Sequence, residues 1–458
     1  MTEGFLFKII ITLQKLARYI LMIRDREVGI GILGLGNVGK GTLDIIDKKR
    51  AFIEEEIKPY RIKLTGFADL DIKRKPNNKQ YASIFTTSAQ QVIENPETKI
   101  IVEAIGGEYP AYDFIKNALE NGKHVVTPNK EVVAKHGYEL LQIAREKQVQ
   151  FLFETSVGSA IPILGVISNI LTSCPLDEIS GILNGTTNYI LDLMFEHNIT
   201  QQEALKKAQE KGYAEADPSK DIMGIDALYK IFILSSLGFR ARLDLEKIEY
   251  SGISDIIQED VQLAKSLGYH IKLLASAIKK DGYLNIQVQP ALVGQEDLLT
   301  KIHGADNGIR LYGESYGKLF FSGAGAGGMA GGSMIVSDIV RIIKQPQCFQ
   351  YDYLLDGSNE VKVKKSGHEE RIYFIRIKQN IKQFANIENN IVKNNLEKNK
   401  IIVENCTEIT NENNELYSGM VTSLVEEDKL KNVLSEIKQQ ANSIEEIKFI
   451  KVYQNSIS

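Results

Sequence analysis

Between residues 27 and 155, short apolar runs alternate with stretches of helical pattern. The runs VGIGIL, RIKLTGFAD, KIIVEAI, GKHVVTPN and VQFLFE are rich in β-branched residues. Strands that are apolar along their whole length are typical of a parallel sheet covered by helices on both faces. The pattern therefore predicts an α/β fold in which a doubly wound Rossmann sheet occupies residues 27–155.

The remainder of the chain predicts two further domains. Between residues 156 and 343, strand patterns such as EISGILN and KLFFSGAG mix with longer helices, which indicates an α+β domain. A polar connector follows over residues 344–369. Residues 370–458 then have the order strand, helix, strand, strand, helix, strand of a ferredoxin-like βαββαβ unit.

The first 26 residues stand apart from this organisation. Their apolar stretch FLFKIIITLQKLARYILMI carries Lys8, Lys15 and Arg18 at roughly helical spacing. A signal anchor is one interpretation. The cations and the missing small-residue cleavage site favour a translated upstream stretch or a peripheral amphipathic helix over a membrane span.

Composition limits the classes of function. A net charge of -4 without a long basic stretch gives no electrostatic reason to expect nucleic acid as a partner, so we expect a small-molecule ligand. Cys174, Cys348 and Cys406 match no metal or redox spacing, and free thiols indicate the cytoplasm. The six histidines form no paired motif, which argues against a histidine-bound metal.

A glycine-rich turn follows the first predicted strand. GLGNVG stands between VGIGIL and a helical stretch, which is the setting in which G-x-G-x-x-G indicates a dinucleotide site. Gly34 permits the tight turn, Gly36 lets the backbone approach the pyrophosphate, and Gly39 allows close packing of the helix. A glycine turn without a ligand is the alternative, and the surrounding parallel-sheet pattern favours the ligand.

The end of the second predicted strand leaves the choice of cofactor open. Asp69 is placed to bind the ribose hydroxyls of NAD, whereas the cations of KRK, residues 73–75, suit the 2′-phosphate of NADP. A solvated loop is the commoner role of such a triplet. The sequence predicts NAD or NADP and does not choose between them.

Acidic residues gather in GYAEADPSKDIMGIDALYK, where Glu215, Asp217, Asp221 and Asp226 precede Lys230. On a helix, Asp226 and Lys230 lie four residues apart and share a face. An ordinary surface ion pair is one interpretation. The apolar continuation KIFILSSLGF favours a buried helix instead. On a buried helix, an unpaired Lys or Asp is energetically costly.

Over roughly residues 28–343 the chain resembles the homoserine dehydrogenase family. The motifs that carry the resemblance are GLGNVG, VVTPNKEVVA, FETSVGSAIP, LNGTTNYIL and, most specifically, GYAEADPSKDIMGIDALYK. The expected cofactor contacts are Gly34, Leu35, Gly36, Asn37, Val38, Gly39, Asp69, Arg74, Ile105, Gly106 and Lys130.

The resemblance also assigns roles around the substrate. It implies that Lys130 and Lys230 lie at the reacting carbonyl, with Lys230 as the first choice for the acid/base, and it adds Asp226 to the catalytic group. The acids that it implies for the substrate ammonium and hydroxyl are Glu215, Asp221 and Asp226. Further substrate contacts implied are Asn184, Gly185, Thr186 and Tyr213. The resemblance also implies that the α+β domain of residues 156–343 serves substrate binding and dimerisation.

FETSVGSAIP resembles the loop that binds a monovalent cation in this family. The implied ligands are the carboxylate of Glu154 and the carbonyls of Val157, Ser159 and Ile161. Oxygen ligands suit sodium better than a transition metal. A strand end that closes in a turn without an ion is the alternative.

Two segments depart from the family pattern. Relatives have a Pro-Thr pair after GAGG, where this chain has Ala330 and Gly331, a change that loosens the backbone and removes a hydroxyl. The C-terminal unit resembles an ACT domain, but its first loop, IKQNIKQFANI, lacks the Asp and Gly that bind an amino acid. We therefore expect a structural or dimer-forming role for it and do not expect regulation by threonine.

The expected function is NAD(P)-dependent interconversion of L-homoserine and L-aspartate 4-semialdehyde in a homo-oligomer, either a dimer or a tetramer. One alternative is a dehydrogenase of another small amino aldehyde or hydroxy acid, although an acidic pocket disfavours a ligand that lacks an ammonium. The other is a catalytically weak NAD(P)-binding regulator, supported by the changed GAGG segment and the altered ACT loop.

Overall fold

The computed structural model describes residues 26–356, 361–364, 369–379, 385–440 and 444–454. The chain forms two compact units. The first unit comprises Met1–Pro162 and Gly327–Asp356, and the second comprises Ile163–Ala326 and Gly357–Ser458. Apart from Arg26, the predicted N-terminal extension lies outside the described residues.

A parallel sheet forms the centre of the first unit, as predicted. The strand order is β3-β2-β1-β4-β5-β6, and all neighbouring pairs are parallel. The strands are β1 (Glu27–Leu33), β2 (Arg61–Ala68), β3 (Phe85–Thr86), β4 (Thr98–Glu103), β5 (His124–Val126) and β6 (Phe151–Leu152). The order reverses between β1 and β4, so ligands are expected in the crevice at the carboxyl ends of these two strands.

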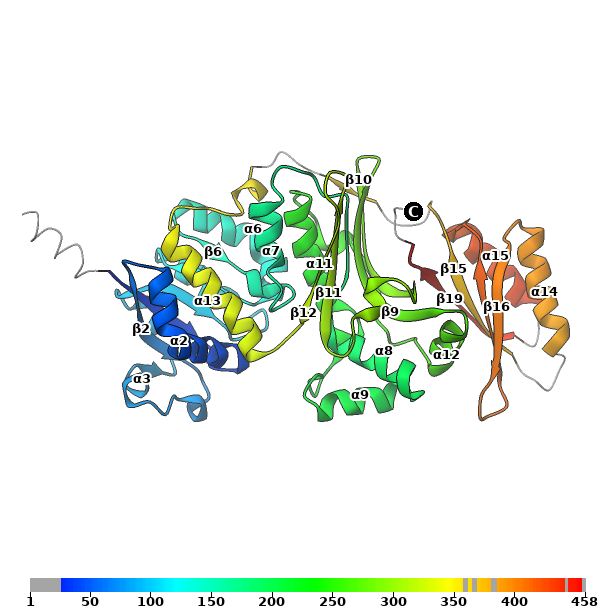
Figure 1. Ribbon diagram of the computed structural model, residues 1–458, viewed down its shortest axis with the longest axis horizontal. Helices are drawn as coiled ribbons and strands as arrows, with labels where there is room; N and C mark the ends of the chain where they lie inside the picture. The colour runs from blue at the N-terminus through cyan, green and yellow to red at the C-terminus, as the bar shows by residue number, and fades with distance from the viewer. Residues whose placement is uncertain (1–25, 357–360, 365–368, 380–384, 441–443, 455–458) are drawn as a thin grey trace, which may run out of the picture. The chain divides into compact units, whose positions relative to one another are not determined.

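Helices cover both faces of this sheet. They are α2 (Asn37–Glu56), α3 (Lys79–Ser83), α4 (Ala89–Glu94), α5 (Ala111–Glu120), α6 (Lys130–Glu146) and α13 (Gly328–Lys344). Although α13 comes from the end of the region expected to form the substrate domain, it lies alongside α2 in the first unit (Figure 1). Glycines permit this close packing, because a Cβ on Gly41 would lie 2.0 Å from the Gly328 carbonyl oxygen.

An eleven-stranded sheet organises the second unit. Its main path is β12-β11-β7-β9-β10-β19-β15-β17-β16. The strands of the predicted α+β region are β7 (Glu178–Ile182), β9 (Tyr269–Lys280), β10 (Tyr283–Gly294), β11 (Asp306–Gly313) and β12 (Gly317–Ala324), and the short β8 (Glu249–Tyr250) and β13 (Lys362–Val363) pair with β10. The helices are α7 (Ile163–Gly165), α8 (Gly185–His197), α9 (Gln201–Glu210), α10 (Ser219–Ile222), α11 (Ile225–Gly238) and α12 (Gln258–Ser266).

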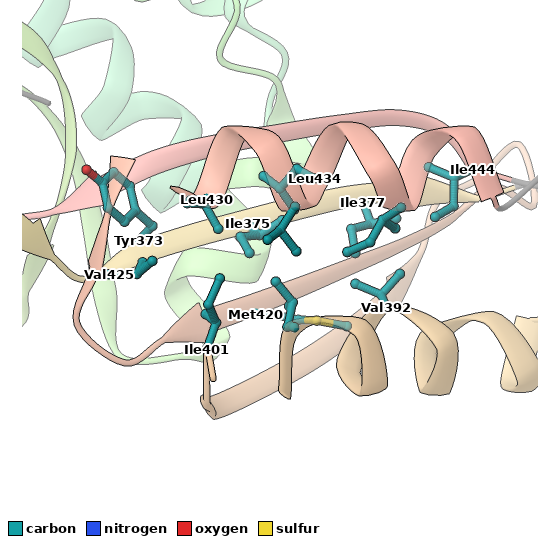
Figure 2. Close-up of a cluster of buried hydrophobic side chains, with 13 residues drawn as sticks. Tyr373, Ile375, Ile377, Val392, Ile401, Met420, Val425, Leu430, Leu434 and Ile444 are labelled. Atoms are coloured by element: carbon teal, nitrogen blue, oxygen red, sulfur yellow. The ribbon is translucent and has the colours of Figure 1, made fainter. Parts of the chain in front are cut away.

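The C-terminal unit has the predicted βαββαβ order. Its elements are β15 (Tyr373–Gln379), α14 (Ala385–Lys398), β16 (Val403–Thr410), β17 (Leu416–Thr422), α15 (Glu427–Gln440) and β19 (Ile444–Val452), with the short β14 (Glu370–Arg371) pairing with β18 (Val425–Glu426). Figure 2 shows Ile375 and Ile377 of β15 facing Leu430 and Leu434 of α15, with Val392 of α14 in the same cluster. The predicted change in the first ACT loop falls largely on residues 380–384, outside the described residues. Within the part of the chain that the structure describes, no helix is both long and apolar enough to cross a membrane.

Candidate active site

The glycine turn after β1 has the geometry that the motif predicts. Gly34 has a φ of +89°, in the left-handed region, and a Cβ on it would lie 2.5 Å from the Ala104 carbonyl oxygen. A Cβ on Gly39 would lie 1.9 Å from the Gly34 carbonyl oxygen. Because α2 begins at Asn37, its N-terminal N–H groups face the turn. The turn is thus suited to the close approach of a pyrophosphate.

Asp69, at the end of β2, anchors this turn. Its Oδ2 accepts a hydrogen bond from the Leu35 N–H at 2.7 Å and one from Arg74 Nη1 at 3.3 Å, and its Oδ1 accepts the Asp71 N–H at 2.9 Å. Burial acts to raise the pKa of Asp69, but these hydrogen bonds and the Arg74 charge lower it below its usual value. The carboxylate is therefore ionised and largely engaged by the protein itself.

The Arg74 side chain remains half exposed beside the glycine turn. Its exposed fraction is 50%, and its Nη1 lies 3.7 Å from the position of a Cβ on Gly36. The guanidinium thus lies at the turn, next to the carboxylate that would bind a ribose. A half-exposed guanidinium can form two parallel hydrogen bonds with a phosphate.

Sequence reasoning missed Glu103, which organises the ends of β4 and β5. This carboxylate is fully buried, and its Oε1 accepts the N–H groups of Ile105 at 2.6 Å and Gly106 at 3.4 Å. Its Oε2 accepts the Thr127 Oγ1 hydroxyl at 2.6 Å. Burial raises the pKa of Glu103, partly offset by these hydrogen bonds. The predicted cofactor residues 105 and 106 are thus fixed by an acid that the motif search did not select.

Lys130 is the first residue of α6, and the turn before it is held by side chains. Asn129 caps the helix, since its Oδ1 accepts the Val132 N–H at 3.2 Å. The Asn129 Nδ2 also donates to the Gly107 carbonyl at 2.7 Å. Two loops at the carboxyl edge of the sheet are therefore tied to each other.

In the second unit, four predicted residues form one cluster, in which Lys230, Asp226 and Asn184 are buried and Asp221 is partly exposed. Lys230 Nζ lies 2.8 Å from Asp226 Oδ2 and donates to the Leu183 carbonyl at 2.7 Å. The Asn184 Nδ2 donates to Asp226 Oδ2 at 2.8 Å and to Asp221 Oδ1 at 2.7 Å. The Lys230 and Asp226 side chains are 8% and 6% exposed, so this is not an ordinary surface pair.

Helices α8 and α11 hold the buried residues of this cluster in place. Asp226 and Lys230 lie four residues apart on the buried helix α11. Asn184 caps α8, and its Oδ1 accepts the Thr187 N–H at 2.8 Å. The side-chain oxygen and nitrogen of Asn184 are therefore both used within the protein. The structure supports a positioning role for this amide.

The remaining predicted substrate residues surround this cluster less closely. Thr186 Oγ1 donates to the Tyr213 carbonyl at 2.7 Å. Gly185 begins α8, and a Cβ on it would lie 2.3 Å from the Ala305 carbonyl oxygen. Tyr213 is 46% exposed, and Glu215 is also exposed. The structure therefore brings together the lysine, two acids and the amide, and leaves Glu215 at the surface of the second unit.

The predicted cation loop is buried in the first unit. Glu154 is 2% exposed, Val157 and Ile161 are buried, and Ser159 has a φ of +48°. Asp338 of α13, which sequence reasoning missed, accepts the Glu154 N–H through its Oδ2 at 3.0 Å. Burial raises the pKa of Asp338 to about 6, against the effect of Arg341.

Buried oxygens in this loop fit an ion with oxygen ligands. Among the described residues the buried Ser156 Oγ has no hydrogen-bond partner, and the buried Asp338 Oδ1 has only an ion pair with Arg341 Nη1 at 3.8 Å. Buried polar atoms normally find a partner, so these oxygens indicate that one is missing. In the described ranges no group of three or more His, Cys, Asp or Glu side chains is arranged to hold a metal, so an ion here would depend on carbonyl oxygens.

Comparison with known proteins bears on both units. The model of the homoserine dehydrogenase NAD-binding domain matches residues 34–154, and the homoserine dehydrogenase model matches residues 162–340. Homoserine dehydrogenase of Bacillus subtilis is 38% identical over 320 residues, which cover 70% of this chain and 73% of that protein. That of Helicobacter pylori is 33% identical over 419 residues, which cover 89% of this chain and 97% of that protein. The chain belongs to the homoserine dehydrogenase family.

Solved homoserine dehydrogenases share the architecture. The crystal structure from Thiobacillus denitrificans has a TM-score of 0.83 and 30% identity, and the match covers 93% of this chain and 98% of that one. A hyperthermophilic archaeal homoserine dehydrogenase in complex with NADPH has a TM-score of 0.59 and 27% identity, over 69% of this chain and 97% of that one. The chain is thus an NAD(P)-dependent oxidoreductase of this family.

The packing at α13 accounts for one departure from the homoserine dehydrogenase pattern. A Cβ on Gly331 would lie 3.2 Å from Thr155 Cγ2 and 3.5 Å from Ser159 Oγ. Thr155 Oγ1 also donates to the Gly331 carbonyl at 3.3 Å. A threonine at position 331 would have to displace these neighbours, so glycine suits this backbone.

Proposed function

We propose that the chain interconverts L-homoserine and L-aspartate 4-semialdehyde with NADP or NAD as the cofactor. The observation that carries this proposal is the cluster of the buried Lys230, Asp226 and Asn184 with the partly exposed Asp221. Burying a charged pair is unfavourable unless its hydrogen bonds are satisfied, and such pairs are often retained for function. The reaction assigned to this pair is that of the homoserine dehydrogenase family, to which the chain belongs.

In this proposal Lys230 is the proton donor and acceptor. A bound nicotinamide supplies the hydride that adds to the aldehyde carbon during reduction. The carbonyl oxygen then takes one proton from the Lys230 ammonium, and in oxidation the lysine receives that proton from the substrate hydroxyl. Asp226 keeps the ammonium oriented, and Lys130 stabilises the developing oxygen charge.

The acids around Lys230 supply the affinity for an amino acid. Asp221 is partly exposed, and we propose that it attracts the substrate ammonium. Glu215 and Tyr213 are exposed and thus accessible to a ligand, and we propose that they contact the substrate, together with Gly185 and Thr186. A hydroxy acid would bring no ammonium to these carboxylates and would bind poorly.

The first unit supplies the cofactor site, and Arg74 favours NADP there. Asp69 already accepts three hydrogen bonds from the protein, whereas the Arg74 guanidinium is half exposed beside Gly36. A 2′-phosphate would meet a cation at this position. The remaining contacts proposed are with the glycine turn, Leu35, Asn37, Val38, residues 105–106 and Lys130.

We further propose a monovalent cation, with sodium as the fitting candidate, at Glu154 and the carbonyls of Val157, Ser159 and Ile161. The buried oxygens of Ser156 and Asp338 support it. The ion would fix the loop that packs against Gly331. A homo-oligomer and a cytoplasmic location are also proposed, the latter on the three cysteines, all free thiols.

Steady-state assays with homoserine and each cofactor test the function. We expect wild-type turnover and, in Lys230→Ala, a fall in kcat of about 100-fold or more. Lys206→Ala, at an exposed position on α9, is the matched control and should leave kcat unchanged. Because the loss of Lys230 leaves a buried acid, NADPH binding by fluorescence must confirm that the variant is folded. NADPH binding without turnover in the wild type would instead identify a regulator.

A further inference from the structure

The carboxylate of Glu103 occupies a position where a hydrophobic side chain would be the usual choice. It ends β4, a strand whose other side chains are mostly buried, and it is itself 0% exposed. Burying a carboxylate is unfavourable unless hydrogen bonds compensate for the water that it loses. The acid is therefore best explained by the groups that it binds.

Those groups belong to two different loops. The Oε1 atom accepts the N–H groups of Ile105 and Gly106, which follow β4, at 2.6 and 3.4 Å. The Oε2 atom accepts the hydroxyl of Thr127, which follows β5, at 2.6 Å. The same hydroxyl oxygen accepts the Asn129 N–H at 3.0 Å, one residue before Lys130. One side chain thus fixes both loops.

The first of these loops packs directly against the glycine turn. A Cβ on Gly34 would lie 2.5 Å from the Ala104 carbonyl oxygen and 2.9 Å from the Ile105 nitrogen. The Ala104 N–H in turn donates to the Leu33 carbonyl at 2.7 Å. Any shift of residues 104–106 therefore changes the surface that surrounds the turn.

We propose that Glu103 is a positioning residue for the reaction, which sets residues 105–106 for the cofactor through Oε1 and the Lys130 turn through Oε2. This inference rests on the proposed function, because it assigns these two loops to cofactor binding and to chemistry. It predicts that Oε1 affects the Kd for NADPH and that Oε2 affects kcat.

Three variants separate the two roles. Glu103→Ala loses both connections, so we expect a rise of about ten-fold in the NADPH Kd and a fall in kcat on the order of 100-fold. Thr127→Val removes the hydroxyl that binds Oε2 and accepts the Asn129 N–H, and it leaves the Oε1 hydrogen bonds in place, so kcat should fall by roughly ten-fold while the NADPH Kd stays within about two-fold. In Glu103→Gln the amide oxygen can still accept both N–H groups, so the NADPH Kd should remain close to that of the wild type.

Asp260→Asn is the matched control, because Asp260 is another buried carboxylate with a backbone partner, on α12 in the second unit. It should lower the thermal midpoint without changing kcat or the NADPH Kd of the folded enzyme. The full-length chain is used throughout, with NADPH fluorescence for Kd and homoserine oxidation for kcat.

The proposal is overturned if Glu103→Ala and Thr127→Val behave like the control, losing stability with unchanged constants. It is also overturned if Thr127→Val raises the NADPH Kd as much as Glu103→Ala does. Should Glu103→Ala fail to fold, Glu103→Gln and Thr127→Val still test the separation of constants. If the wild type does not oxidise homoserine, the proposed function fails, whereas the NADPH Kd values still decide the part played by Oε1.

Discussion

Arg74 is the side chain on which the choice between NADP and NAD depends. Its guanidinium shares the Asp69 carboxylate with the Leu35 N–H and lies beside Gly36. The sequence alone shows an acid followed by three cations and cannot say which of them faces the cofactor. In the structure the Arg74 Nη1, which donates to Asp69, lies 3.7 Å from the position of a Cβ on Gly36, and the Arg74 side chain stays half exposed.

We therefore predict that Arg74→Ser raises KM for NADPH by about 10- to 100-fold, since one or two charge-assisted hydrogen bonds are lost. KM for NADH should change much less, because NADH carries no 2′-phosphate. Initial-rate assays with both cofactors measure the effect, and Lys73→Ser in the same loop serves as the control. Equal effects of Arg74→Ser on the two cofactors would assign Arg74 a purely structural role.

Spacing alone, without the family resemblance, links only those site residues whose partners are near in sequence. Asp226 and Lys230 share one helix, so their spacing already indicates contact. Glu103 ends β4 whereas Thr127 follows β5, and Asp338 lies 184 residues from Glu154, whose N–H it accepts. No spacing rule links such pairs. An isolated acid at the end of the apolar run KIIVE, followed by a glycine pair, is the only sequence signal that Glu103 gives.

At the scale of elements, the short strands β5 and β6 depend on a histidine. His124 begins β5, and its Nδ1 accepts the Gln150 N–H, just before β6, at 3.0 Å. Burial lowers the pKa of His124 to about 4. An acceptor nitrogen must be unprotonated, so the neutral ring is the form that stabilises this edge of the sheet.

The sign of the pH dependence follows from this pKa. Between about pH 6.5 and 4 the unfolded chain binds a proton at His124 that the folded chain does not, so stability falls as the pH is lowered. The contribution lost by pH 4.5 is about 2 kcal/mol. In His124→Asn the amide oxygen can accept the Gln150 N–H at any pH. Urea unfolding from pH 4.5 to 7 should therefore show a shallower decline for the variant, and equal slopes would contradict the assignment.

The order of elements was predictable from periodicity, but their long-range packing was not. Apolar runs separated by helical stretches predict the parallel sheet, and the C-terminal pattern predicts βαββαβ. The placement of α13 on α2 depends on Gly41, Gly328 and Gly332, whose close backbone contacts join distant segments. The pairing of β19 with β10 is equally non-local. Hydrophobic pattern shows that a face is buried and does not show against what.

At the scale of the whole molecule, the C-terminal unit is continuous with the sheet of the second unit. Besides the β10–β19 pairing, Tyr453 donates through its hydroxyl to Glu178 at 2.6 Å. Helix α12 of the second unit, which precedes the C-terminal unit in the chain, packs against β16 and β17 and carries Asp260. The Asp260 carboxylate lies 3.1 Å from Arg376 of β15, and the two side chains are 3% and 2% exposed. The C-terminal βαββαβ unit thus has its own core and also supports the rest of the second unit, to which it belongs.

This junction gives the last prediction. Burial raises the pKa of Asp260 to about 6, and the Arg376 charge acts against that rise, so Arg376→Met should leave a poorly compensated acid. Loss of one partner of a buried pair is expected to lower the free energy of unfolding by about 3–5 kcal/mol. Asp260→Asn combined with Arg376→Met should recover part of this loss, because the Asn oxygen can still accept the Ile257 N–H that Asp260 accepts at 3.0 Å.

Urea unfolding of the full-length chain measures both variants, with Lys448→Ala, which removes the exposed Lys448–Asp255 pair, as the control. If the C-terminal unit contributed nothing to the stability of α12 and its sheet, Arg376→Met would perturb only a separate transition of that unit. If homoserine oxidation is instead lost at the same, lower urea concentration at which Arg376→Met unfolds, the C-terminal unit and the sheet of the second unit unfold together. Such a result would give the C-terminal unit a structural role that does not require an amino-acid ligand at its first loop, which lacks the Asp and Gly of ACT domains.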